Sequence, residues 1–270
     1  MPKIISIGMQ KGGVGKTTLA VNISGMISYL LSRNDENVKV LLIDLDPQAS
    51  ATSFFFKQND PINYKDSIVA LFDTDAPTKI VKHNPKIIRS THYHNLDIVP
   101  SHIRLSVAEA AFLTEDGRRL FYWIQGTAQE YDYIVIDCPP SLGRLTTNAL
   151  MASQFCVIPC QPEAQSVDAL SLYGDIIGNF KEINESLNFL GIIISMLNDR
   201  ESTHKYYKSR LNSTFKDLII GEIHRGTHFT KIAHNRELLI EGEKDRREYR
   251  ECKAITLEIL KRIQQVTENG

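Results

Sequence analysis

Residues 11–18 read K-G-G-V-G-K-T-T and lie between an apolar run at residues 4–8 and a longer segment of helical periodicity that starts at residue 19. A strand, a glycine-rich turn and a helix in this order are typical of a phosphate-binding loop. The glycines let several backbone N–H groups point at phosphate oxygens, and the start of the helix adds the positive end of its dipole. The stretch therefore predicts an α/β nucleotide-binding domain.

Two side chains of this loop are expected to contact phosphate and metal. Lys16 is placed to contact the β- and γ-phosphates, and the Thr17 hydroxyl is placed to ligate magnesium. Gln10 replaces the first glycine of the usual pattern, and a second lysine, Lys11, begins the loop, which is the deviant Walker A form. The expected ATP contacts of the loop are Lys11, Gly12, Gly13, Val14, Gly15, Lys16, Thr17 and Thr18.

The composition is that of an ordinary globular protein. The chain has 270 residues, of which 42% are hydrophobic and 23% charged, and its formal net charge is −1. This balance argues against a wholly basic nucleic-acid coat protein but allows a local basic patch. The four cysteines form no C-x-x-C pair, which is typical of a reduced protein with structural thiols. Since no apolar run approaches the roughly 20 residues of a membrane span and no signal peptide opens the chain, we expect a cytoplasmic protein.

Strand-like apolar runs alternate with segments of helical periodicity along the chain. A parallel sheet covered by helices produces this alternation, so we expect one domain over residues 1–270, with a mostly parallel twisted sheet and helices on both faces. The expected strands lie at 4–8, 38–44, 96–100, 133–137, 155–159, 189–195 and 218–222, and the expected helices at 15–32, 102–114, 117–130, 144–153, 165–184, 201–214 and 246–266.

Two parts of the chain lack such a pattern. Residues 57–95 are expected to form loops and short helices, and the stretch between the last strand and the last helix is expected to be irregular. The first part contains His83, His92 and His94, whose spacing fits no metal-ligand pattern.

Aspartates follow two of the expected strands, at the sheet edge where α/β proteins bind ligands. Asp137 ends the run I-V-I-D and is expected to hold magnesium directly or through water, as a Walker B residue. Asp44 and Asp46 end the strand that we expect beside the loop. Asp46 lies past the strand end and is predicted to orient or deprotonate the attacking water, while Asp44 supports the loop and the magnesium shell. The expected metal site is thus Thr17, Asp44 and Asp137, and the expected catalytic residues include Lys16 and Asp46.

Four motifs between about Lys3 and Leu197 together resemble the ParA family of partition ATPases. They are K-G-G-V-G-K-T-T, L-L-I-D-L-D-P-Q-A-S-A-T, Y-I-V-I-D-C-P-P-S-L and V-I-P-C-Q-P-E. The resemblance implies an ATPase that dimerises face to face around two ATP molecules, with Lys11 reaching the partner's phosphates as a third catalytic residue. It also implies that Asp46 is the hydrolysis aspartate and that Pro159 and Glu163 lie in a turn facing the dimer.

The last third, residues 198–270, is basic in part and diverges from the family. Asn198 follows a strand that resembles the one near the adenine, so it is a candidate base contact. At 223–226 the chain has I-H-R-G where the family has I-P-R-N. Between Arg200 and Arg236 there are eight Lys and Arg residues and three Asp and Glu residues, which favours binding to phosphate backbones without sequence readout. The candidate DNA contacts are Arg200, Lys205, Lys208, Arg210, Arg225, Lys231 and Arg236.

The resemblance further implies a nucleoid-associated switch. ATP binding would produce a homodimer on non-specific double-stranded DNA, and a ParB-like centromere-binding protein would stimulate hydrolysis and release. Because the first strand starts at Lys3, we expect no preceding helix-turn-helix and no operator-specific binding.

Two alternatives share the loop. One is a membrane-associated ATPase that places the division site, for which the last helix would have to lie on a membrane. That helix has Glu251 and Glu258 and no polybasic tail, so packing on the sheet is expected instead. The other is an iron–sulfur reductase, which needs bridging cysteines. Cys138 directly follows Asp137 and so lies too close to the nucleotide, and Cys156 and Cys160 flank a buried strand. These positions argue against a cluster bridged between two subunits.

Overall fold

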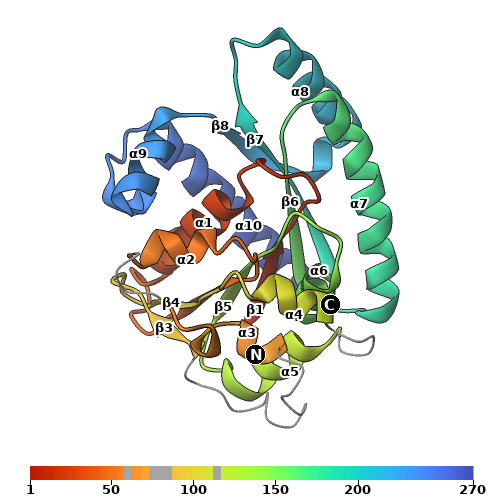
Figure 1. Cartoon of the computed structure of the whole chain (residues 1–270). Helices are drawn as coiled ribbons and strands as arrows, with labels where there is room; N and C mark the ends of the chain where they lie inside the picture. Colours follow the sequence, from red (N-terminus) through yellow and green to blue (C-terminus); the bar gives the residue numbers. More distant parts are fainter. Residues whose placement is uncertain (58–61, 73–86, 112–116, 270) are drawn as a thin grey trace.

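β1 (Lys3–Ile7) lies inside an eight-stranded sheet with the order β3-β4-β2-β5-β1-β6-β7-β8 (Figure 1). The computed structural model describes residues 1–57, 62–72, 87–111 and 117–269. Neighbouring strands are parallel except β3 and β4, which are antiparallel. This confirms the expected mostly parallel sheet. The other strands are β2 (Val40–Asp44), β3 (Arg89–Ser90), β4 (Leu96–Val99), β5 (Tyr133–Asp137), β6 (Phe155–Cys160), β7 (Asn188–Leu197) and β8 (Ile219–His224).

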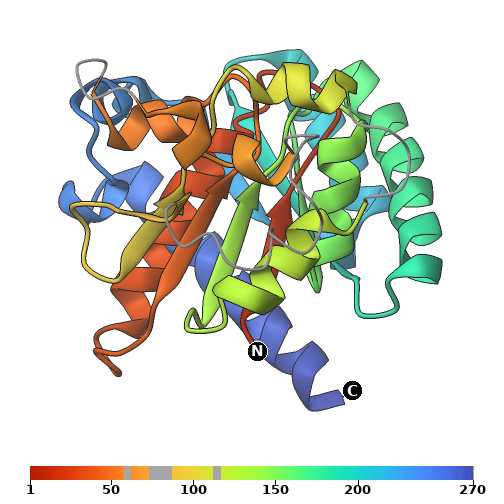
Figure 2. The ribbon, with the colours of Figure 1, turned by 60° about the horizontal axis from the view of Figure 1, so that its bottom comes forward.

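Helices cover both faces of the sheet because alternate side chains of each strand point to opposite faces (Figure 2). Ile5 packs in a core with α1 and α10, whereas Ile4 packs in a core with α5 and α6, and a third core lies against α7. The α-helices are α1 (Lys16–Leu31), α2 (Ser50–Phe55), α3 (Val69–Phe72), α4 (Leu105–Ala111), α5 (Arg119–Thr127), α6 (Arg144–Ala152), α7 (Ala164–Ile183), α8 (Ser202–Thr214), α9 (Thr227–Asn235) and α10 (Arg247–Asn269). Short 3-10 turns are η1 (Tyr64–Asp66), η4 (Lys216–Leu218) and η5 (Leu239–Glu241).

The strand order places β5 between β1 and the Asp44 strand. β5 pairs with β1, and β2, which we expected beside the loop, pairs with the far side of β5. The connection through α1 skips one position in the sheet, and β5 fills it later in the chain. Asp44 and Asp137 are register partners at the carboxyl ends of β2 and β5. Both carboxylates therefore still lie at the ligand-binding edge.

The stretch expected to be irregular before the last helix was assigned wrongly, since it contains α9 and η5. α9 has only nine residues, and only Ile232 of them is buried. The last helix packs Ile255, Ile259 and Ile263 against α1 and the sheet, as expected. Among the described residues, no helix is long and apolar enough to cross a membrane.

The segment 57–95 contains short elements, as expected, where it is described. Thr91 and Tyr93 make hydrogen bonds within the turn that joins β3 to β4, and the Asn95 side chain donates to the Glu36 carbonyl at 2.7 Å. His83 lies outside the described residues, as do positions 112–114 of the expected helix at 102–114. In the described part of the chain, no group of three His, Cys, Asp or Glu side chains could hold a metal ion.

Candidate nucleotide site

The loop between β1 and α1 depends on its glycines, and one side chain from β7 and one from α7 approach it closely. Gly13 and Gly15 have φ angles of 77° and 84°, the left-handed region that favours glycine. The buried Ser195 hydroxyl of β7 donates a hydrogen bond of 2.7 Å to the Val14 carbonyl. A Cβ at Gly8 would lie 2.6 Å from the Tyr173 hydroxyl oxygen of α7. Sequence reasoning missed Ser195 and Tyr173, since neither belongs to a loop motif.

Lys16 is a buried cation inside this loop. Its ammonium donates a hydrogen bond of 2.9 Å to the Lys11 carbonyl. Burial lowers the pKa of Lys16, and the negative charges of Asp137 and Asp46 oppose that shift. A buried ammonium is costly unless it meets anions, so the centre of the loop is suited to a polyphosphate.

Asp137 is fully buried, and its carboxylate oxygens accept no well-formed hydrogen bond from the described residues, although the Thr17 hydroxyl is close enough to stabilise its charge. Burial raises the pKa of Asp137 well above its usual value, and Asp44 raises it further. The Thr17 hydroxyl and Lys16 act in the opposite direction. A buried carboxylate next to a hydroxyl, with no well-formed hydrogen bond on the carboxylate, matches the oxygen ligands of magnesium. Asp137 and Thr17 therefore fit the expected metal.

Asp44 is equally buried but accepts three hydrogen bonds. One oxygen accepts from the Thr52 amide and hydroxyl, both at 2.7 Å, and the other accepts from the Asp46 amide at 3.2 Å. Burial raises the pKa of Asp44 to about 7, although these donors lower it. Asp46 is 9% exposed and accepts a hydrogen bond of 2.9 Å from the Gln48 amide. Asp44 and Asp137, the register partners, therefore differ in how much of each carboxylate is left to bind a ligand.

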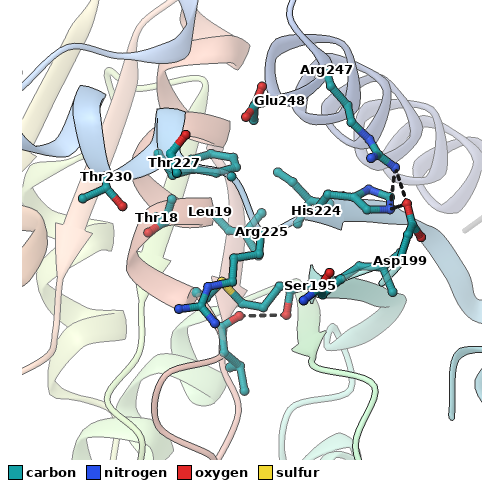
Figure 3. A pocket seen from close by; sticks show the side chains of 18 of the residues that line it. Thr18, Leu19, Ser195, Asp199, His224, Arg225, Thr227, Thr230, Arg247 and Glu248 are labelled. Atoms are coloured by element: carbon teal, nitrogen blue, oxygen red, sulfur yellow. Dashed lines mark hydrogen bonds and ion pairs between the residues drawn. The ribbon is translucent and has the colours of Figure 1, made fainter. Parts of the chain in front are cut away.

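A pocket of about 1070 Å³ opens beside the loop, between the start of α1 and the ends of β7 and β8 (Figure 3). Its walls include Val14, Gly15, Thr18, Met196, Asn198, Arg225, Thr227 and Phe229. The Asn198 amide lies on this wall but is engaged, since it donates to Glu201 at 2.6 Å and accepts from the Arg200 amide at 3.1 Å. Mostly uncharged walls next to a phosphate loop suit a nucleoside.

His224, which stands where the family has proline, closes one side of this pocket. Its Nδ1 lies 2.7 Å from Glu251, and its Nε2 lies 3.0 Å from Asp199. Arg247 binds both carboxylates, as Figure 3 shows for Asp199. The cluster ties the ends of β7 and β8 to the start of α10, so the histidine has a structural role that the proline could not have.

Comparison with known proteins agrees with this geometry. A family model described as an AAA domain matches residues 2–189. The sporulation initiation inhibitor protein Soj of Bacillus subtilis is 37% identical over 225 residues, which cover 79% of this chain and 83% of Soj. The chromosome partitioning protein ParA of Myxococcus xanthus is 35% identical over 220 residues, covering 80% and 73%. The chain belongs to the ParA family of P-loop ATPases.

A solved structure extends the ParA-family likeness to the full fold. A plasmid partition protein from Borrelia burgdorferi B31, bound to AMPPNP, superposes with a TM-score of 0.78 at 30% identity. The match covers 97% of this chain and 99% of that chain. The divergent last third thus shares the fold of a partition protein, although its I-H-R-G segment departs from the ParA-family sequence.

The deviant lysine of this ParA-family chain is paired within its own subunit. The Lys11 ammonium forms an ion pair with Glu163, which precedes α7, and both side chains remain partly exposed. Pro159 is buried inside β6, where it is the register partner of Ile193. Pro159 can therefore affect the expected dimer interface only through the turn that follows β6. Glu163 lies in that turn.

The structure divides the candidate DNA contacts into three groups. Arg200 and Arg225 line the pocket mouth, where Arg225 is exposed and extends across the opening (Figure 3). Lys205, Lys208 and Arg210 lie on α8, and Lys231 and Arg236 lie on or just after α9. α8 and α9 are on opposite sides of the ends of β7 and β8 (Figure 1). Lys208 is partly neutralised by Glu222 at 2.5 Å.

Proposed function

We propose that the protein is an ATP-dependent DNA-partition switch. ATP binding produces a dimer that holds double-stranded DNA without sequence preference, and hydrolysis, stimulated by a ParB-like centromere-binding protein, releases it. The observation that carries this proposal is the buried Asp137 carboxylate, which lies beside the Thr17 hydroxyl and the Lys16 ammonium in a ParA-family fold. Membership of the family and the AMPPNP bound to its Borrelia relative support ATP as the nucleotide.

The proposed reaction is the attack of water on the γ-phosphorus. Asp46 orients this water and accepts its proton, the bond from the γ-phosphorus to the β,γ-bridging oxygen breaks, and ADP and phosphate leave. Lys16 binds the β- and γ-phosphate oxygens. Thr17 and Asp137 would hold magnesium, which when bound neutralises charge on these oxygens. Asp44 keeps the Asp46 turn in place through its hydrogen bonds.

Lys11→Ala is expected to separate ATP binding from dimerisation. The loop itself needs only the Lys11 carbonyl, which the substitution retains, so the affinity for ATP should stay within about fivefold. The dimer should lose a cation at the partner's γ-phosphate, and hydrolysis should fall by about 100-fold. Light scattering after size exclusion with ATP measures the dimer, and Lys261→Ala, exposed on α10, is the control. An ATP-dependent Lys11→Ala dimer as stable as that of the wild type would contradict the role of Lys11.

Arg225→Ala is expected to weaken ATP-dependent binding to non-specific duplex DNA by about tenfold and to reduce the salt slope by about one. Lys208→Ala should have a smaller effect, because Glu222 already neutralises part of its charge. Fluorescence anisotropy with ATP, ADP or no nucleotide, at several salt concentrations, measures both effects. Lys181→Ala, exposed at the end of α7, is the control. If the wild type binds no DNA in any nucleotide state at low salt, the DNA-partition proposal is wrong.

A further inference from the structure

The turn between β2 and α2 carries Asp46 and is held at both ends by the Asp44 carboxylate. The residue before α2, Ala49, has φ 53° and ψ 37°, in the left-handed region, and its methyl group cannot cap the helix. The Asp44 carboxylate does so instead by accepting the Thr52 amide at 2.7 Å. Asp44 also accepts the Asp46 amide, so the same carboxylate holds both ends of the turn.

Thr52 fixes this carboxylate in turn. Its hydroxyl donates to the same Asp44 oxygen at 2.7 Å and accepts the Ser101 amide, from the segment after β4, at 2.7 Å. Thr52 and Ser101 are both buried. One hydroxyl therefore connects the end of β2, the first turn of α2 and the segment after β4. Hydrogen bonds to an ionised or partly ionised carboxylate are among the strong ones in proteins.

Asp44 and Asp137 form a contrasting pair at the same level of the sheet. The oxygens of Asp44 accept three hydrogen bonds from the β2–α2 segment, while those of Asp137 accept none from the described residues. Asp44 therefore keeps about one acceptor position free, whereas no well-formed hydrogen bond from the described chain occupies the oxygens of Asp137. Asp44 is thus placed as an anchor of the turn rather than as a magnesium ligand.

We propose that Thr52 is a positioning residue for hydrolysis, acting through Asp44 to hold Asp46 against the phosphate loop. This inference rests on the proposed ATPase function and assigns Asp44 a different role from the expected one. Misplacing a catalytic group by about 1 Å can lower a rate by about 100-fold. The loss should appear in turnover rather than in ATP binding, because Thr52 contacts Asp44 and Ser101 and not the loop.

The test compares Thr52→Val, which removes the hydroxyl at nearly constant shape, with Thr52→Ser, which retains it. Thr256→Val is the matched control, since Thr256 is a buried threonine of α10 whose hydroxyl donates to the Cys252 carbonyl at 2.8 Å. For Thr52→Val we expect kcat to fall by about 30-fold with KM for ATP changed by less than about threefold. Thr52→Ser should restore kcat to within about threefold, and Thr256→Val should leave it unchanged.

Asp44→Asn tests the anchor role separately, including the case in which Thr52→Val does not fold. As an anchor, Asp44→Asn lowers kcat while the magnesium concentration for half-maximal rate stays within about threefold of the wild type. A rise of tenfold or more in that concentration overturns the anchor role. A Thr52→Val kcat within twofold of the wild type, or Thr52→Ser as slow as Thr52→Val, overturns the role of Thr52. If the wild type itself hydrolyses no ATP, the proposed function fails and this inference fails with it.

Discussion

Asp46→Ala is expected to bind ATP with nearly wild-type affinity and to hydrolyse it about 10²- to 10⁴-fold more slowly, the usual contribution of a general base. Asp46 is almost fully buried at the carboxyl end of β2, and its charge acts on Lys16. It is held by the Gln48 amide and by the hydrogen bond from its own amide to Asp44. Removal of the carboxylate leaves the P-loop hydrogen bonds in place, so the ATP-bound state should persist and DNA should be retained for longer.

Lys16→Ala supplies the contrasting result. The Lys16 ammonium is the buried cation at the centre of the loop, so its loss should weaken ATP binding itself by about 100-fold or more. DNA binding should then disappear in every nucleotide state. Titration with a fluorescent ATP analogue, phosphate release and DNA anisotropy on the same samples distinguish the two variants. An Asp46→Ala protein that hydrolyses ATP at the wild-type rate would remove Asp46 from the mechanism.

Asp137→Asn is expected to stabilise the nucleotide-free protein while it abolishes magnesium-dependent hydrolysis. The buried carboxylate has no hydrogen-bond donor from the described residues, and leaving such a group unsatisfied typically costs on the order of 2 kcal/mol. The amide avoids the cost of burying a charge. Lys16 loses one counter-charge in this variant but keeps Asp46, so we expect the free energy of unfolding at pH 8 to rise.

The pH dependence of stability follows from the same burial. The pKa of Asp137 is raised in the folded chain, so above the usual Asp value of about 3.9 the folded state binds more protons than the unfolded state. The stabilisation by the bound proton is complete below that value and is lost as pH rises through the folded pKa. Asp44, whose pKa is raised to about 7, likewise makes the folded state less stable as pH rises towards neutrality. The free energy of unfolding of Asp137→Asn should therefore exceed that of the wild type most at high pH and only slightly near pH 4.

Urea unfolding of the nucleotide-free protein between pH 5 and pH 8 measures this difference. Asp175→Asn, exposed on α7, is the control and should follow the wild type. Equal or lower stability of Asp137→Asn at pH 8 would show that the carboxylate is compensated in the folded state. Retained magnesium dependence of hydrolysis would separately exclude Asp137 as the metal ligand.

The sequence alone determined the features that depend on local order along the chain. The strand–glycine–helix order at residues 4–19 identified the phosphate loop, because that conformation is encoded by neighbouring residues. The alternation of apolar runs with helical periodicity predicted the mostly parallel sheet with helices on both faces. The short helix α9 was missed, since it has only nine residues and only Ile232 of them is buried.

Only the tertiary structure decided which side chains meet. It placed β5 between β1 and β2, paired Lys11 with Glu163, and brought the Ser195 hydroxyl to the Val14 carbonyl. Asp44 and Asp137 have the same local signature, an aspartate at the end of an apolar strand. They differ because Thr52 donates two hydrogen bonds to Asp44, whereas Asp137 accepts no well-formed hydrogen bond from the described residues. Hydrogen-bond satisfaction depends on contacts between segments distant in the chain, such as Thr52 with the Ser101 amide, and no local pattern encodes such contacts.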